Sequence, residues 1–303
     1  MHVLHVAGLR KFYGPEPVLD GVTFDVFAGD RAGLVGPNGT GKTTLLKIIA
    51  GRESSDGGEC LITGGVKLGY LEQHAEFPPE RTVWEEARTA VRHLLDLQHE
   101  AETTAARLAQ AQDSAERRRL ATRFDHLQQE LHRLNAYHLD HKIEQVLEGL
   151  GLGPSYYDRP ADQLSGGEQN RLLLAKLLLA EPDLMLLDEP SNHLDIDATR
   201  WLEEFLADHR AAMIIVSHDR YFLDRVTNRT LELYRGTIET YTGNFSAYLR
   251  QKEERLLVAR RTYEKQQEEI AKAEEFIRRH HYGQKAAQAQ DRRKKLERIE
   301  LVE

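Results

Sequence analysis

A glycine-rich segment near the amino terminus constrains the fold more than any other feature of the chain. Residues 36–44 read Gly-Pro-Asn-Gly-Thr-Gly-Lys-Thr-Thr and match the P-loop pattern. An apolar run at 33–35 precedes them, and a stretch with helical character follows from 42 to about 50. The glycines of such a loop let backbone N–H groups wrap a chain of phosphates, and the start of the next helix favours negative charge. The strand–loop–helix order predicts a nucleotide-binding α/β core.

Two side chains of this loop have the chemistry that a bound nucleotide needs. Lys42 would reach the β- and γ-phosphates, and the Thr43 hydroxyl would bind Mg²⁺. The other residues of the expected ATP-binding loop are Gly36, Pro37, Asn38, Gly39, Thr40, Gly41 and Thr44. A pattern of this kind also occurs by chance, but the flanking strand and helix support the phosphate-binding interpretation.

An apolar run that ends in two acids, residues 184–189, predicts the second half of the pocket. Asp188 would lie beside the magnesium ion, and Glu189 is placed to hold or deprotonate the attacking water. The alternative is a pair of surface acids after a core strand. A third motif, Leu164-Ser165-Gly166-Gly167-Glu168, precedes an apolar helix and could form another anion site, although a simple turn with a helix cap fits the same residues.

Residues 82–147 differ in composition from their surroundings. Glycine is absent there, and two seams with alternating steps of three and four residues run from Val91 to Gln112 and from Leu120 to Leu134. Asp113 lies between the seams, where it can cap the second helix. We expect an antiparallel helical hairpin inserted into the α/β domain.

The carboxyl-terminal part is helical and basic. A seven-residue recurrence predicts a long helix, which Gly283 would interrupt, and a further helix begins at residue 286; the recurrent positions are Leu249, Leu256, Tyr263, Ile270 and Ile277. The net charge of the whole chain is −8, but residues 278–303 carry eight basic and four acidic side chains. An acidic body therefore precedes a basic end. Two interpretations fit this end: it binds RNA phosphates, or it is a charged helix that faces solvent.

Composition excludes several classes of protein. No run approaches the roughly 18 apolar residues of a membrane span, and residues 1–12 lack the plan of a signal peptide. The single cysteine, Cys60, excludes an internal disulfide or a cysteine-based zinc site, and we expect it to serve packing. No second copy of the α/β unit occurs. The sequence indicates a soluble, cytoplasmic chain with one such unit.

Taken together, the P-loop, Gln73, LSGGE, LLLDEP, SNHLD and His218 resemble the ATP-binding cassette (ABC) ATPases in order and separation. The resemblance implies a P-loop NTPase fold of the ABC type, with ATP and Mg²⁺ as cofactors. It implies that Tyr13 stacks on adenine, that Gln73 joins the magnesium and water shell, and that His218 contacts the γ-phosphate. The plainer interpretations are a core aromatic residue for Tyr13, an ordinary polar residue for Gln73, and a helix N-cap or a surface histidine for His218.

The ABC resemblance also implies that one chain cannot complete a catalytic site. In ABC ATPases, ATP lies between the P-loop of one cassette and the signature of another. The signature would contact the nucleotide held by the opposite cassette, and it comprises Ser165, Gly166, Gly167 and Glu168. Asp195 would lie in the loop that crosses the interface between the cassettes. We therefore expect a second cassette or a homodimer partner.

Within the ABC ATPases, the whole chain resembles the ABC-F subfamily. The marks are SNHLD at 191–195, SHDRYFL at 217–223, YTGNF at 241–245 and the basic segment after Phe276. The resemblance implies a cassette at 1–245 with an arm-type hairpin at about 82–147, and an incomplete helical linker at 246–303. The second cassette would be missing, so we expect a fragment.

A further implication of the ABC-F resemblance is a ribosomal partner. ABC-F proteins bind rRNA and tRNA near the E site and the peptidyl-tRNA; ATP binding would close the cassettes, and hydrolysis would release the factor. The residues expected to face RNA are Arg278, Arg279, Lys285, Arg292, Arg293, Lys294 and Lys295. Translation regulation, rescue of stalled ribosomes and antibiotic protection all fit.

Three other functions stay open on the sequence. An ATPase subunit of a membrane transporter would have a much shorter segment between Gln73 and Leu164. A non-enzymatic, nucleotide-dependent scaffold would bind a protein partner through its helices, and unchanged RNA binding after neutralising the basic tail would favour it. A DNA-repair cassette would carry zinc or much longer coiled coils, and one cysteine argues against the zinc.

Overall fold

The structure is a computed structural model that describes residues 1–71, 77–134, 136–279 and 286–296. The chain divides into two compact units, Met1–Phe245 and Ser246–Glu303. Three residues named in the sequence analysis, Gln73, Gly283 and Lys285, lie outside the described residues.

A six-stranded sheet forms the centre of the first unit. Its order is β5-β6-β7-β3-β8-β9, with every neighbouring pair parallel except β8 and β9. The strands are β3 (Arg31–Val35), β5 (Leu68–Tyr70), β6 (Leu184–Asp188), β7 (Ala212–Val216), β8 (Arg229–Tyr234) and β9 (Thr237–Thr242). Strands β6 and β7 are buried at every residue, as expected for apolar runs in a parallel sheet that is covered on both faces.

A smaller antiparallel sheet packs against the same core. It has the order β2-β1-β4 and comprises β1 (His2–Phe12), β2 (Pro17–Phe27) and β4 (Gly57–Ile62). Helix α1 (Lys42–Ile49) shares one hydrophobic cluster with both sheets, because its Leu45, Leu46, Ile48 and Ile49 are buried among their side chains. Each such leucine or isoleucine contributes about 1.5–3 kcal/mol to folding by burial. This packing fixes α1, and with it the loop before α1, against the central sheet.

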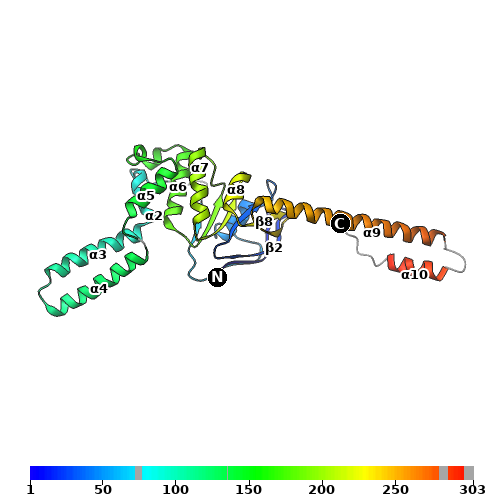
Figure 1. The fold of residues 1–303 in the computed structure, drawn as a ribbon, viewed down its shortest axis with the longest axis horizontal. Helices are drawn as coiled ribbons and strands as arrows, with labels where there is room; N and C mark the ends of the chain where they lie inside the picture. Colours follow the sequence, from blue (N-terminus) through cyan, green and yellow to red (C-terminus); the bar gives the residue numbers. More distant parts are fainter. Residues whose placement is uncertain (72–76, 135, 280–285, 297–303) are drawn as a thin grey trace. The chain divides into compact units, whose positions relative to one another are not determined.

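The remaining helices of the first unit include a projecting hairpin. They are α2 (Val83–Ala90), α3 (Arg92–Gln110), α4 (Ser114–Arg133), α5 (Leu139–Gly149), α6 (Gly166–Ala180), α7 (Ile196–Asp208) and α8 (Arg220–Val226), with short 3₁₀ turns at Pro154–Tyr156 and Ala161–Gln163. Helices α3 and α4 lie side by side and antiparallel (Figure 1), since Glu100 pairs with Arg123 and Arg107 with Glu116. The predicted hairpin is confirmed.

The hairpin has a thin core. Ala101 of α3 and Leu127 of α4 are buried along the predicted seams, whereas Leu134 at the end of the second seam is exposed. Asp113 caps α4 as expected, because its carboxylate accepts a hydrogen bond from the Glu116 N–H (3.1 Å). Helices α2 and α5 pack against α6 instead, so the projecting part is shorter than residues 82–147.

The second unit contains two described helices. Helix α9 spans Phe245–Arg279, and α10 spans Ala286–Leu296. The seven-residue recurrence lies on α9, but Leu249, Leu256 and Tyr263 are exposed. Among the described residues, no helix combines the length and the hydropathy that a membrane crossing requires.

Candidate functional site

The P-loop joins β3 to α1 and is shaped by its glycines. Gly36 has φ +156°, and a Cβ atom there would lie 2.3 Å from the Leu233 carbonyl oxygen. Gly41 has φ +97°, and its Cβ atom would lie 2.5 Å from Val18 Cγ1. Any larger residue at either position would therefore force the loop away from the sheet. Gly41 is also the residue before the first turn of α1, and no side chain caps this turn, so the amides at the start of α1 suit an anion such as a phosphate.

Lys42 lies beneath the loop, with its ammonium held by loop carbonyls. Its Nζ donates to the carbonyl oxygens of Gly36 and Pro37, both at 2.9 Å. Burial lowers the pKa of Lys42, and the charges of Glu189 and Asp188 act against this effect. The ammonium thus sits between the loop that would hold phosphates and two carboxylates.

Thr43 and Asp188 bring α1 and β6 together. The Thr43 hydroxyl donates to Asp188 Oδ2 at 2.7 Å, and Asp188 is buried at the carboxyl end of β6. A hydroxyl and a carboxylate at this spacing form the all-oxygen donor pair that Mg²⁺ prefers. The residues present therefore fit a magnesium ion, with Gln73, the third expected ligand, outside the described residues.

Glu189 follows Asp188 and adopts a strained backbone. Its φ is +54°, a conformation that costs a residue with a side chain about 1–2 kcal/mol, and its N–H donates to the Val216 carbonyl at 2.8 Å. Glu189 Oε2 accepts from the backbone N–H of His218 at 3.1 Å, and Oε1 lies 3.5 Å from His218 Nε2. The backbone turn therefore aims the carboxylate across to the end of β7.

The second oxygen of Glu189 is available for chemistry. Oε1 is buried and accepts no hydrogen bond from any residue that the structure describes. Burial raises the pKa of the Glu189 carboxyl, and the nearby Asp188 charge raises it further, against opposing effects of His218 and Lys42. A buried oxygen of raised basicity, beside a magnesium-type donor pair, is suited to accept a proton.

Tyr13 lies beside α1. Its ring is exposed, its hydroxyl donates to Glu53, and the same oxygen is 3.4 Å from Thr44 Oγ1. Lys11 Nζ lies 5.4 Å from the ring centroid. The expected alternative of a core aromatic residue is wrong, because the ring is 63% exposed. Adenine stacking stays a prediction.

The LSGGE motif forms the start of α6. Ser165 Oγ accepts from the Glu168 N–H at 3.4 Å and donates to Glu168 Oε2 at 2.7 Å, and the Ser165 N–H donates to the same carboxylate oxygen at 2.8 Å. Ser165 also lowers the pKa of Glu168 by these hydrogen bonds. The turn is exposed, and no hydrogen bond or ion pair within the described part of the chain links it to the P-loop. It is a reciprocal helix cap that presents Ser165 and Gly166 outward.

Asp195 caps the next helix, α7. Its Oδ1 accepts from the Ala198 N–H at 2.8 Å, and both Asp195 and the adjacent Ile196 are exposed. A cavity of about 230 Å³ runs from the catalytic candidates to Leu194, the residue before Asp195, and its lining residues include Glu189, Asn192, His193 and Arg171.

Arg171 and His193 are residues of this region that sequence reasoning missed as site candidates. Arg171 Nε is buried and donates to no described residue, and His193 has φ +67° and packs on Gly167. His193 lies in the SNHLD motif, which is a usable signal. Arg171 has no such signal, because only the packing of α6 beside the segment after β6 brings it there.

The predicted RNA-facing residues lie on the second unit. Arg278 and Arg279 end α9, with Arg279 paired to Glu275. On α10, Lys295 pairs with Asp291 at 3.2 Å, and Arg293 and Lys294 are exposed. Lys285 and the Arg292 side chain lie outside the described residues.

Comparison with known proteins agrees with this geometry. Two family models, both described as ABC transporter, match residues 19–192 and 231–303. The protein YdiF of Bacillus subtilis is 41% identical over 303 residues, which are 100% of this chain and 47% of YdiF. The energy-dependent translational throttle protein EttA of Mycobacterium tuberculosis is 38% identical over 96% of this chain and 50% of its own.

One more relative and one solved structure complete the comparison. ABC transporter F family member 5 of Arabidopsis thaliana is 38% identical over 97% of this chain and 43% of its own length. The chain thus spans about half the length of these curated relatives. A solved ATP-binding subunit of an ABC transporter covers 79% of the chain with a TM-score of 0.58 at 22% identity, which supports the fold.

Proposed function

Since the chain belongs to the ATP-binding cassette family, and within it to the ABC-F subfamily, we propose that it binds ATP with Mg²⁺ and takes part in hydrolysing it to ADP and phosphate. One observation carries the proposal: the Thr43–Asp188 hydrogen bond lies beside a buried Glu189 oxygen that has no described hydrogen-bond donor. Oxygen ligands and a base at one end of a parallel sheet, next to a P-loop, are the parts that phosphoryl transfer to water needs.

The residues of the site would divide the work by position. Backbone amides of residues 36–44 and the Lys42 ammonium would hold the phosphates, while Thr43, Asp188 and Gln73 would hold Mg²⁺. Bound magnesium would neutralise charge on the phosphate oxygens. Tyr13 would stack on adenine, and His218 would contact the γ-phosphate.

Proton transfer would fall to Glu189. Its Oε1, which accepts no hydrogen bond from a described residue, would accept the proton of the attacking water as the oxygen of that water bonds to phosphorus and the bond from phosphorus to the leaving ADP oxygen breaks. The raised pKa of this carboxyl makes it a better acceptor than an exposed glutamate. The backbone N–H of His218 donates a hydrogen bond to Glu189 Oε2, which fixes the carboxylate and leaves Oε1 to accept the proton.

We propose that the complete site needs a second cassette or a second copy of this chain. The Ser165–Glu168 turn and the segment at Asp195 and Ile196 are exposed and have no polar contact to their own P-loop among the described residues. A signature that faces outward suits a nucleotide held elsewhere. ATP would then close two cassettes, and hydrolysis would open them.

In its cellular role, the protein is proposed to act on the ribosome, in the region of the E site and the peptidyl-tRNA. The similarity to a translational throttle protein and to an F family member supports this role. The cassette would be residues 1–245, with the arm within about 82–147, and residues 246–303 would be a helical linker whose basic end meets RNA. The factor would work in the cytoplasm.

Replacing Glu189 tests the enzymatic part of the proposal. Glu189→Gln should keep ATP affinity and reduce hydrolysis by roughly 10²–10⁴-fold, because glutamine removes the proton acceptor but has the same side-chain shape. Hydrolysis is measured for the chain alone and for the chain mixed with a second cassette, with solution mass recorded at each step. Glu204→Gln, an exposed glutamate on α7, is the matched control. Hydrolysis by Glu189→Gln at the parent rate would contradict the assigned role.

The ribosomal part has a separate test. Co-sedimentation with ribosomes, with and without ATP, compares Arg293→Gln/Lys294→Gln on α10 with Arg260→Gln/Arg261→Gln on α9. Both pairs remove two positive charges from exposed helix positions. Binding should weaken and become less dependent on salt for the α10 pair alone, since phosphate contacts dominate RNA affinity. Equal binding by both pairs would favour a partner protein over RNA.

A further inference from the structure

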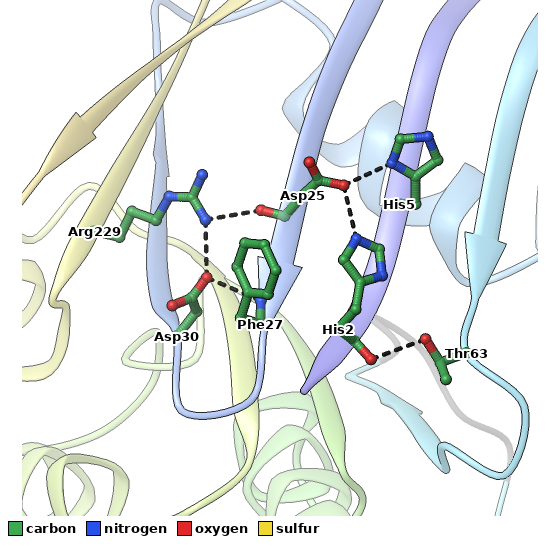
Figure 2. A network of polar contacts seen from close by, with 7 residues as sticks. All are labelled: His2, His5, Asp25, Phe27, Asp30, Thr63 and Arg229. Carbon is green, nitrogen blue, oxygen red and sulfur yellow. Dashed lines mark hydrogen bonds and ion pairs between the residues drawn. The ribbon is translucent and has the colours of Figure 1, made fainter.

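Two histidines and one aspartate meet on the outer face of the three-stranded sheet. His2 Nε2 lies 2.8 Å, and His5 Nδ1 2.6 Å, from the same atom, Asp25 Oδ1 (Figure 2). Each of the three side chains is about 40% exposed. These residues have no part in the proposed ATP chemistry, so their convergence needs its own explanation.

A β-bulge brings the two histidines to one face. Side chains alternate along a strand, so positions 2 and 5 would normally point to opposite faces. In the β1–β2 pairing, His2 is opposite Phe27 and Leu4 is opposite Val26, which leaves Val3 as an extra residue. Val3 and Leu4 are both buried, and the bulge turns His2 to the side of His5 and Asp25.

The three donor atoms match one class of cation. They lie within 4.8 Å of one another and comprise two imidazole nitrogens and one carboxylate oxygen. Zn²⁺ accepts such a mixed set, whereas Mg²⁺ and Ca²⁺ require oxygen ligands. Cys60 on the adjacent β4 adds no ligand, because it packs against the core and burial raises the pKa of its thiol.

We propose that His2, His5 and Asp25 form a Zn²⁺ site whose remaining coordination positions are taken by water. Zinc bonds of about 2.0–2.1 Å in a tetrahedron place ligand atoms roughly 3.3 Å apart, so the two ring nitrogens would each move away from Asp25 Oδ1 by roughly 0.5–0.7 Å. Each zinc–nitrogen bond replaces an N–H. The displaced proton leaves to solvent from an imidazolium, or moves through solvent to the other ring nitrogen of a neutral imidazole.

Neighbouring residues hold the ligands in place. Thr63 Oγ1 donates to the His2 carbonyl at 2.9 Å, and the Phe27 ring meets the His2 ring edge-on with centroids 5.3 Å apart. Arg229 Nη1 donates to the Asp25 carbonyl and to Asp30 Oδ2, both at 2.8 Å (Figure 2). Because the Asp30 carboxylate neutralises the guanidinium charge, Arg229 can hold the backbone of Asp25 in place and repel a bound Zn²⁺ ion only weakly.

Zinc binding by the whole chain, purified without a polyhistidine tag, tests the site. Calorimetric titration should show one Zn²⁺ per chain above the background of the other histidines, and Co²⁺ in its place should give a tetrahedral visible spectrum. His2→Asn, His5→Asn and Asp25→Asn should each weaken binding by roughly tenfold or more. The control is His126→Asn, an exposed histidine of α4, which should leave both readouts unchanged.

Three results would overturn the site. They are no saturable equivalent of zinc, equal affinity in the cluster variants and the His126 control, and a loss confined to His2→Asn. The last would mean that His2 binds the ion without His5 and Asp25. Circular dichroism in the presence of a chelator checks folding, and Asp25→Asn, which preserves the side-chain shape, decides the outcome if a histidine variant does not fold.

Discussion

Two carboxylates of the first unit face histidine, yet their pKa values move in opposite directions. Glu189 lies at the end of the parallel sheet, where burial raises its pKa above the usual 4.5 despite His218. Asp25 lies on the outer face of the antiparallel sheet, where hydrogen bonds from His5 and then His2 lower its pKa below the usual 3.8. Both are beside an imidazole, so the imidazole does not decide the direction.

The difference is set by solvent and by hydrogen-bond count. One carboxylate oxygen of Glu189 is buried away from water, and no described residue donates a hydrogen bond to it in place of that water. The charged form of Glu189 is therefore disfavoured. Asp25 keeps water and has one oxygen shared by two ring nitrogens, which favours its charged form. The first arrangement suits proton transfer, and the second suits holding a positive charge.

The largest expected effect separates the two regions as cation sites. Asp188→Asn, beside Glu189, should weaken magnesium-dependent ATP binding by at least roughly tenfold, because a ligand of the ion is lost. Asp25→Asn should leave that affinity unchanged. Titration with a fluorescent ATP analogue at several Mg²⁺ concentrations measures both, and an equal loss in the two variants would break the comparison.

A smaller effect concerns stability at neutral pH. Glu189→Gln should raise the free energy of unfolding by up to about 1 kcal/mol, since it removes a desolvated charge. Asp25→Asn should lower it by at most about 1 kcal/mol, because the paired groups are well exposed and screened. Urea denaturation of the chain without zinc gives both values. The same sign for both variants would contradict the assigned environments.

The smallest effect is the pH dependence of those two differences. The raised carboxyl pKa of Glu189 means that the advantage of Glu189→Gln is full above that pKa, shrinks as the pH falls toward 4.5, and is gone below it. The lowered pKa of Asp25 means that protonation of Asp25 itself removes its contribution only as the pH falls below 3.8 and through the folded-state pKa. Urea midpoints of the parent and Glu189→Gln should therefore converge between pH 7 and 4.5, whereas those of the parent and Asp25→Asn should not converge.

Most of the catalytic candidate cluster follows from sequence because its signals are local. The apolar run before Gly36 and the run before Asp188 each specify a buried strand, and the parallel strands of one sheet end at the same edge even where another strand lies between them. The hairpin was predictable for a similar reason, since its seams repeat along each helix. Its limits were not, because whether α2 and α5 join α6 depends on tertiary packing.

Features that depend on pairing between distant segments escaped the sequence analysis. Strand β4 has no fully buried residue and gives no alternating apolar pattern. The cluster of His2, His5 and Asp25 requires both the β1–β2 register and the bulge at Val3, and neither is visible in the order of residues. The same holds for Arg171, which only the fold brings beside the residues after β6.

The reciprocal cap at the start of α6 has a consequence for recognition. Ser165 and Glu168 hold each other through three hydrogen bonds, so an exposed turn that contains two glycines already has its backbone ordered in the free chain. Glycine loses more conformational freedom on ordering than other residues, and here that loss accompanies folding instead of association. The turn is a preorganised binding surface. Its affinity for a matching surface therefore depends more on the contacts formed than on conformational entropy lost on binding.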